Sequence, residues 1–200
     1  MDTVLGIVYD GGVVVAADQT NARSILIYQH HLDKVAPLSS HSVLGCSGPN
    51  ADFVNFSEYL AKNLALYELS NDTKLSTNAQ ANFCRGELAR ALRKGPYQVN
   101  VLLGGWDEKA GGTLYFIDYL ASMQKVNFGA QGYASNFCLS IFDKEWKPGM
   151  TLDEAVTVID HCIRELQQRF LISQPNFVVK VVDKDGVRVV KQGADPAENS

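Results

Sequence analysis

Short apolar runs separated by glycine-containing turns are the strongest pattern in the first part of the chain. Two of them, VLGIV and VVVAA, flank Asp10-Gly11-Gly12. An Asp-Gly pair between apolar runs predicts a β-hairpin, because glycine accepts the positive φ angles of tight turns. We therefore expect strands over about 3–9 and 13–18. Neither run alternates apolar with polar residues, so cover is expected on both faces of this hairpin.

Further strands and turns are predicted along the rest of the chain. The runs SILIY, DKVAPL and HSVLGCS, at 24–28, 33–38 and 41–47, are short and bounded by polar or turn residues, as strands are. Two later hairpins are expected, one turning at 108–111 and one at 184–186. Sheet is therefore expected at both ends of the chain and near its middle.

Four segments show helical periodicity instead. The first begins after Pro49, and the second begins at Ser76. A short third helix is expected over 134–145, and the capping box Thr151-Leu-Asp-Glu154 opens the fourth. The apolar stripe predicted for the first helix consists of Phe53, Phe56, Leu60, Leu64 and Tyr67.

The order of these elements favours a layered fold. Strands, two helices, strands, two helices and strands again allow two sheets to stack, with helices on the outer side of each. We expect an α+β fold, a four-layer αββα sandwich with two stacked, mainly antiparallel sheets. A two-layer α+β domain is the alternative, but it would expose half of VVVAA to water. Residues 1–192 are expected to form one domain and 193–200 a disordered tail.

Composition supports a single globular domain and limits the partners. The chain has 200 residues, 46% apolar and 20% charged, with a net charge of −4. Its basic residues are dispersed, so no nucleic-acid partner is expected, whereas a protein partner stays open. The chain has no run of about 18 apolar residues, and its first residues lack the features of a secretory signal. We therefore expect a soluble intracellular protein without membrane contact.

Candidate chemistry is sparse when only spacing is considered. The four cysteines and four histidines show no metal-ligand spacing, so no metal, cofactor or disulfide is expected, and reduced thiols favour the cytoplasm or nucleus. GCSGP fails as a nucleophile elbow at Pro49, which leaves a turn with Ser47 or Asn50 capping the next helix. Asp18 and Lys34 each border an apolar strand; an ion pair between them and two unrelated solvated charges are equally open.

Four segments taken together resemble a proteasome β subunit: GIVYDGGVVVAAD, LDKV, LGCSGPNAD and YQVNVLLGGWDEKAGGTLYFIDY. The resemblance covers about residues 1–190 and is greatest to the beta-4 type, also called beta type-2. The segments YELSND, ANFCRGELARAL, PYQVN and LQQRFLIS carry that finer likeness. The resemblance implies the αββα fold of the N-terminal-nucleophile hydrolases.

The resemblance also implies which catalytic groups to look for. Active members of the family use an amino-terminal threonine, whose hydroxyl attacks the peptide carbonyl while its free α-amine serves as base. Met1 and Asp2 stand here instead and offer no hydroxyl, and Thr3 is internal. We therefore expect no working nucleophile. Thr3 has a hydroxyl, but its internal amide nitrogen has no usable lone pair and cannot act as the base. The alternative is an active threonine hydrolase in which trimming exposes Thr3.

Several supporting positions of the family carry over one at a time. Asp18 and Lys34 match the aspartate and lysine that assist the threonine. Gly48 matches the glycine whose amide forms the oxyanion hole, and Ser173 matches a serine of the family pattern. In a chain without the nucleophile, Asp18 and Lys34 are expected to be a retained structural pair.

Two further polar positions depart from the family. Gln131 stands where active members have a serine, and Phe170 stands where they have an aspartate. Because partial loss of a cooperative catalytic unit costs nearly as much as complete loss, little hydrolysis is expected. The resemblance therefore implies a chain with no working catalytic residue.

The function that the resemblance implies is structural. The chain is expected to be a non-catalytic subunit of the 20S proteasome β ring, which helps to enclose the chamber where proteins are degraded, in the cytoplasm and nucleus. Its expected partners are neighbours of the beta-3 and beta-5 types, the α ring and the facing β ring. A free-standing binding domain is the remaining alternative. Inter-subunit contacts, which would shape a neighbour's substrate groove, are predicted at Ile25, Leu26, Ile27, Tyr28, Tyr115, Tyr119 and Lys125.

Overall fold

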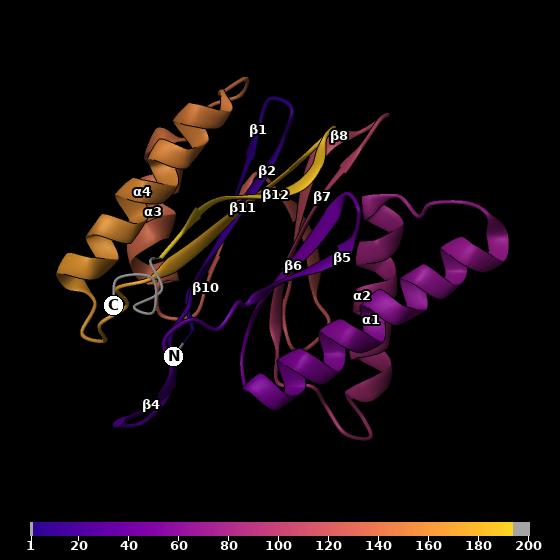
Figure 1. The fold of residues 1–200 in the computed structure, drawn as a ribbon, viewed down its shortest axis with the longest axis horizontal. Helices are drawn as coiled ribbons and strands as arrows, with labels where there is room; N and C mark the ends of the chain where they lie inside the picture. Colours follow the sequence, from indigo (N-terminus) through magenta and orange to yellow (C-terminus); the bar gives the residue numbers. More distant parts are fainter. Residues whose placement is uncertain (1, 194–200) are drawn as a thin grey trace, which may run out of the picture.

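Two antiparallel five-stranded sheets lie face to face in the computed structural model, which describes residues 2–193 apart from the side chain of Arg23 (Figure 1). The first sheet has the order β10 (Phe128–Gln131), β1 (Val4–Tyr9), β2 (Gly12–Asp18), β11 (Phe177–Asp183) and β12 (Gly186–Gln192). The second has the order β5 (Val35–Ser39), β6 (Ser42–Ser47), β7 (Asn100–Asp107), β8 (Gly111–Ile117) and β9 (Met123–Val126). A separate two-stranded hairpin consists of β3 (Asn21–Arg23) and β4 (Leu26–Gln29).

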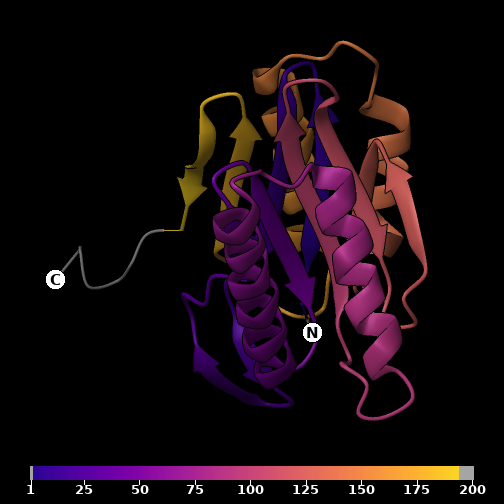
Figure 2. The ribbon, with the colours of Figure 1, turned by 90° about the vertical axis from the view of Figure 1, so that its right-hand side faces the viewer.

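Helices form the two outer layers. Helices α1 (Asn50–Asn71) and α2 (Thr77–Ala91) pack on the second sheet, and α3 (Ser135–Glu145) and α4 (Leu152–Arg169) pack on the first (Figures 1 and 2). The predicted four-layer αββα sandwich is therefore confirmed. The predicted tail, 193–200, lies outside the described residues except for Gly193.

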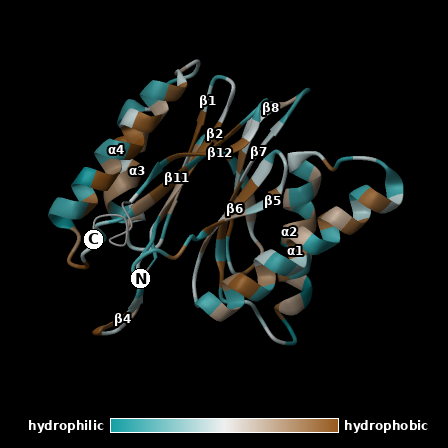
Figure 3. Cartoon of the chain, viewed as in Figure 1, coloured by the Kyte–Doolittle hydropathy of each residue, from teal (hydrophilic) through white to brown (hydrophobic). Residues whose placement is uncertain are grey.

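The core is divided by the sheets into three apolar clusters. Val13 and Val15 of β2 point into the space between the sheets, whereas Val14 and Ala16 point toward α3 and α4. All seven residues of β2 are buried. This explains why VVVAA does not alternate with polar residues, and the apolar colour of the central strands in Figure 3 shows the same arrangement.

Helix ends agree with the sequence in two places and differ in one. Thr151 accepts a hydrogen bond from the Glu154 N–H at 3.3 Å and donates its own N–H to the Glu154 carboxylate at 2.8 Å, so the predicted capping box is confirmed. Helix α2 begins beside the predicted start, and the Ser76 side chain caps it by accepting the Ala79 N–H. The predicted side-chain cap of α1 is wrong: Pro49 stands at the N-cap position, where it makes no side-chain hydrogen bond.

Several boundaries differ because tertiary contacts decide them. Strand β4 begins at Leu26 rather than residue 24, since Ser24 has a φ of 57° and forms the turn of the β3–β4 hairpin. Strands β3, β9 and β10 are not predicted, because they have only three or four residues each and no local strand pattern. Tyr67, predicted on the inner stripe of α1, is 45% exposed.

The four cysteines are buried and form no disulfide with one another. Among the described residues, no helix is both long enough and apolar enough to cross a membrane. The same part of the chain contains no cluster of three or more histidine, cysteine, aspartate or glutamate residues suited to a metal ion.

Candidate functional site

Four strand ends bring four of the predicted site residues together at one end of the sandwich, the end from which the β3–β4 hairpin projects in Figure 1. Strand β2 ends at Asp18, β5 begins directly after Lys34, and β6 ends directly before Gly48. Asp2 precedes β1 by two residues. Residues that are far apart in the sequence therefore meet because the two sheets are stacked with these strand ends at the same end of the sandwich.

Lys34 lies at the centre of this site. Its side-chain ammonium contacts the Asp18 carboxylate at 2.9 Å, the Asp2 carboxylate at 2.7 Å and the Thr20 carbonyl oxygen at 2.7 Å. The residue is almost completely buried. Three acceptors match the three N–H donors of an ammonium group, so this buried charge is fully paired. Asp18 and Lys34 thus form the ion pair that was one of the two expectations.

Asp18 is equally enclosed and holds the backbone around it. One carboxylate oxygen accepts the Thr3 N–H at 2.7 Å, and the other accepts the Thr20 N–H at 3.2 Å in addition to the Lys34 ammonium. Burial raises the pKa of the Asp18 carboxyl, and the nearby Lys34 charge and the Thr3 N–H oppose that rise. The carboxylate therefore ties the start of β1 to the end of β2 and to Lys34.

Asp2 joins two groups that the family resemblance assigns to catalysis. While one of its carboxylate oxygens contacts Lys34, the other accepts the Gly48 N–H at 3.0 Å. Gly48 has a φ of +139°, and a Cβ there would lie 2.3 Å from the Gln98 carbonyl oxygen, so only glycine fits. A fixed carboxylate thus occupies the amide donor that the resemblance matches to an oxyanion hole.

Thr3 faces the other side of the first sheet. Its hydroxyl donates to the Gln174 side-chain oxygen at 2.8 Å, and the residue is 1% exposed. Val4 packs between the sheets and Leu5 packs toward α3 and α4, so alternation along the strand places Thr3 on the same side as Leu5. Asp2 is on the opposite side, with Lys34. Sequence reasoning missed Gln174, because it lies in a connection without periodicity.

The remaining predicted positions are placed apart from Lys34. Gln131 is buried, donates to the Val101 carbonyl oxygen at 2.7 Å and accepts the Ser47 hydroxyl at 3.2 Å, which links β10 to the second sheet. Phe170 packs beside Phe137, with ring centres 6.0 Å apart. Ser173 is exposed. Met1 lies outside the described residues.

The predicted contact residues fall into two groups. The β3–β4 hairpin leaves four consecutive apolar side chains exposed, from Ile25 at 93% to Tyr28 at 62%, and Tyr119 and Lys125 are exposed as well. Tyr115 differs from expectation: it is only 6% exposed, and its hydroxyl donates to Asn78 of α2 at 3.2 Å. It is buried because its side of β8 is covered by α2.

Comparisons with known proteins define the class. A family model described as "Proteasome subunit" matches residues 1–182. The chain therefore belongs to the proteasome subunit family, and its sandwich is the N-terminal-nucleophile hydrolase fold of that family. Membership in the family implies association with other proteasome subunits.

The relatives identify the type of subunit. The chain is 48% identical to proteasome subunit beta type-2-B of Arabidopsis thaliana over 188 residues, which is 94% of each chain. It is 50% identical to proteasome subunit beta type-2 of Oryza sativa subsp. japonica, covering 94% of this chain and 89% of the relative. Identity to proteasome subunit beta type-4 of Saccharomyces cerevisiae is 38%, covering 95% and 97%. The predicted likeness to the beta-4 type, called type-2 in plants, is thus confirmed.

Proposed function

We propose that this chain is a non-catalytic subunit of the 20S proteasome β ring, whose work is to close the ring and to help enclose the degradation chamber. The observation that supports this function is the Asp2 carboxylate, which lies between the Lys34 ammonium and the Gly48 N–H. Both donors that a threonine hydrolase would need for its reaction are already paired with an anion of the chain itself.

The chemistry of acyl transfer explains why this pairing matters. Attack on a peptide carbonyl places negative charge on the carbonyl oxygen, and catalysis depends on free donors aimed at that oxygen. The Gly48 N–H is bonded to Asp2, and the Lys34 ammonium has three acceptors. A developing oxyanion would have to displace a carboxylate that is held by a buried charge.

Trimming to Thr3 would remove Asp2 and free both donors, but it would not bring a hydroxyl group to them. The Thr3 hydroxyl points toward Gln174, on the opposite side of the sheet from Lys34. Turning it toward Lys34 requires a one-residue slip of β1, which would exchange the two faces of the strand and expel Leu5 from its cluster. The alternative function, an active threonine hydrolase, is therefore disfavoured by packing.

A mechanism-based, threonine-directed probe applied to the assembled particle tests the proposal. We expect intact-mass analysis to find this chain unmodified, while the catalytic subunits of the same particle carry the label and serve as the positive control. A chain that starts at Thr3 and carries the probe would contradict the proposal.

The same proposal extends to partners and location. By family resemblance, the ring neighbours are of the beta-3 and beta-5 types, with further contacts to the α ring and the facing β ring, in the cytoplasm and nucleus. The exposed hairpin from Ile25 to Tyr28 projects from the end that carries Lys34. It is suited to contact a neighbouring subunit beside that neighbour's own substrate groove.

A further inference from the structure

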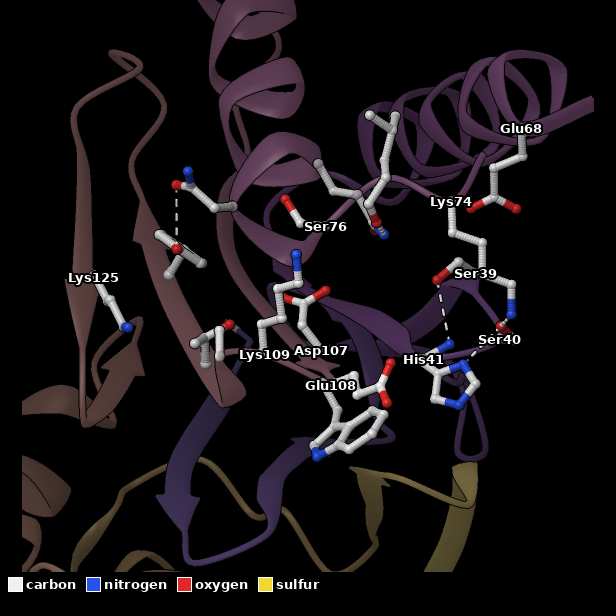
Figure 4. A pocket seen from close by; sticks show the side chains of 17 residues that line it. Ser39, Ser40, His41, Glu68, Lys74, Ser76, Asp107, Glu108, Lys109 and Lys125 are labelled. Carbon is white, nitrogen blue, oxygen red and sulfur yellow. Dashed lines mark hydrogen bonds between the residues drawn. The ribbon is translucent and has the colours of Figure 1, made fainter. Parts of the chain in front are cut away.

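A cavity of about 680 Å³ lies at the end of the sandwich opposite to the Asp18–Lys34 site (Figure 4). Its lining residues include three lysines and three carboxylates, so their charges balance and favour no class of ligand. Chemistry that the proposed function does not use is found instead where α3 packs against α4, at two buried cysteines (Figure 1).

Cys138 of α3 and Cys162 of α4 face each other across the contact between the two helices. The Cys138 sulfur lies 4.0 Å from the Cys162 carbonyl oxygen, and the Cys162 sulfur lies 4.0 Å from the Cys138 carbonyl oxygen. Each side chain therefore reaches the backbone of the other residue, so the two residues are directly opposite one another. Both are completely buried, and both are free thiols.

The other two cysteines lack this reciprocal contact. Cys46 of β6 and Cys84 of α2 are buried on the other side of the sandwich, and no hydrogen bond joins them in the part of the chain that the structure describes. A disulfide requires side chains that point toward each other, with Cβ atoms about 3.5–4.5 Å apart. The contacts in both directions favour Cys138 and Cys162 for such a bond, and rotation about χ1 is the motion that would join their sulfurs.

While α3 and α4 are packed together, this pair is protected from oxidation. The neighbouring Cys138 thiol, followed by burial, raises the pKa of the Cys162 thiol. Because the thiolate is the reactive form, a buried thiol with a raised pKa reacts slowly with disulfides. Oxidation therefore requires the contact between α3 and α4 to open, so that an oxidant can reach the sulfurs.

Helix α3 is suited to such an opening. Of its 11 residues only Cys138 and Phe142 are buried, and its N-cap residue, Ala134, makes no side-chain hydrogen bond. Helix α4, by contrast, has six buried residues and a capping box. Segments with few buried apolar contacts open locally at a lower free energy than the whole chain unfolds. Movement of α3 alone would therefore expose Cys138 and Cys162 together, while α4 stays packed on the sheet.

We propose that Cys138 and Cys162 form a redox-sensitive link between α3 and α4, a disulfide that a low-molecular-weight disulfide such as oxidised glutathione makes when α3 opens. The thiolate of one cysteine attacks oxidised glutathione, which forms a mixed disulfide and releases one glutathione thiolate. The second cysteine attacks the mixed disulfide at the protein sulfur, forms the internal bond and releases the second glutathione. The two cysteines are thereby oxidised, oxidised glutathione is reduced, and the two released glutathiones take up the two thiol protons. The new bond holds α3 against α4.

The test treats the full recombinant chain with oxidised glutathione, alkylates the free thiols and measures the intact mass. We expect a species in which two thiols have escaped alkylation and two hydrogen atoms are lost, and peptide mapping should join Cys138 to Cys162. The matched control C46A/C84A should form the same link. In Cys138→Ala, Cys162 has no partner, so its oxidation should stop at the mixed disulfide with glutathione.

A second pair of variants tests the opening of α3. Phe142→Leu removes part of a buried ring from α3, and Phe56→Leu makes the same change at an equally buried ring of α1. Loss of packing under α3 lowers the free energy of its local opening, so we expect Phe142→Leu to speed the formation of the link several-fold. Phe56→Leu should leave the rate close to that of the parent.

Three results would overturn the proposal. Mixed disulfides without an internal link would show that the Cys138 and Cys162 sulfurs cannot be joined. A link between Cys46 and Cys84 that forms as fast would show that the reciprocal contact does not select the pair. Equal acceleration by Phe142→Leu and Phe56→Leu would show that the whole chain, and not α3, has to unfold first.

Discussion

Asp2 is the residue on which the interpretation of the site depends. From the sequence, Asp2 is predictable only as a residue without the catalytic hydroxyl, because no local pattern around it indicates a partner for its carboxylate. The structure places it against Lys34 and Gly48, at distances that make it the third corner of a buried polar cluster. Asp18 and Lys34 could be named from the sequence, whereas the role of Asp2 depends on strands that meet only in the folded chain.

Replacing Asp2 with alanine should open an anion site. In Asp2→Ala, the Gly48 N–H loses its acceptor and Lys34 loses one of three, so we expect a loss of about 1–3 kcal/mol in the free energy of unfolding. Formate should restore part of that loss by occupying the vacated position, and chloride at equal ionic strength should not.

Thermal unfolding of the recombinant chain measures this effect. Glu58→Ala is the control, since Glu58 pairs with Lys62 on the exposed surface of α1, where water and salt screen the pair, and its loss should leave the stability nearly unchanged. An Asp2→Ala chain as stable as the parent, or one indifferent to formate, would show that the Asp2 contacts carry no stability.

Tyr9 predicts a loss of stability in alkali. Burial, followed by the hydrogen bond from its hydroxyl to Asp183 at 3.1 Å, raises the pKa of Tyr9 from 10.0 to about 12. A folded-state pKa above the unfolded one favours the protonated, folded form, so this contribution is complete below pH 10 and is lost as the pH rises toward 12.

The variant Tyr9→Phe isolates that contribution. Urea midpoints of parent and variant, measured at about pH 9 and about pH 11.5, should differ in favour of the parent at the lower pH and converge at the higher. Because lysines also titrate in this range in both chains, only the difference between the chains is interpreted. A gap that stays constant or widens at high pH would contradict the assignment to Tyr9.

At the scale of elements, those with a local sequence signal could be predicted, whereas those that depend on distant contacts could not. The β1–β2 hairpin could be predicted, since Asp10-Gly11 encodes its turn within the hairpin itself. The start of helix α4 could also be predicted, because its capping box is visible in the sequence. Neither MQKV of β9 nor FGAQ of β10 contains such a signal, because β9 is a strand through its pairing with β8 and β10 through its pairing with β1. Their register comes from partners, which a single segment does not encode.

The β3–β4 hairpin offers a test of the proposed subunit contacts. Ile27→Asp places a charge on an exposed apolar side chain, and we expect it to reduce incorporation into the particle or to lower the peptidase activity of a neighbouring subunit. Ile27→Leu, at the same position, keeps the apolar surface and should behave as the parent. Unchanged assembly together with unchanged activity of every peptidase would count against the hairpin as a contact.

At the scale of the whole molecule, the four layers could be predicted from the sequence, because a strand buried on both faces has an unbroken run of apolar residues. The distance between the two sheets could not be predicted, because it depends on contacts between individual atoms of facing strands. A Cβ on Gly45 of β6 would lie 2.6 Å from a methyl group of Val4. The absence of a side chain at Gly45 therefore permits the sheets to approach.

The substitution Gly45→Ala should force the sheets apart. We expect it to lower the free energy of unfolding by about 1–3 kcal/mol through overpacking. Gly86→Ala is the matched control, because nothing lies within 4 Å of a Cβ on Gly86 in α2, so alanine there should be neutral or should stabilise by about 0.5–1 kcal/mol. Denaturant titration compares the two. Similar effects in both variants would show that the sheet spacing is tolerant.

The exposed apolar side chains of the β3–β4 hairpin, from Ile25 to Tyr28, make newly synthesised copies of this chain prone to self-association. Until a neighbouring subunit covers the hairpin, its apolar surface and the unpaired backbone along both its edges can bind other molecules. Unassembled copies should therefore aggregate as their concentration rises. A cell that makes this chain benefits from matching its synthesis to that of its neighbours, or from shielding the hairpin until they arrive.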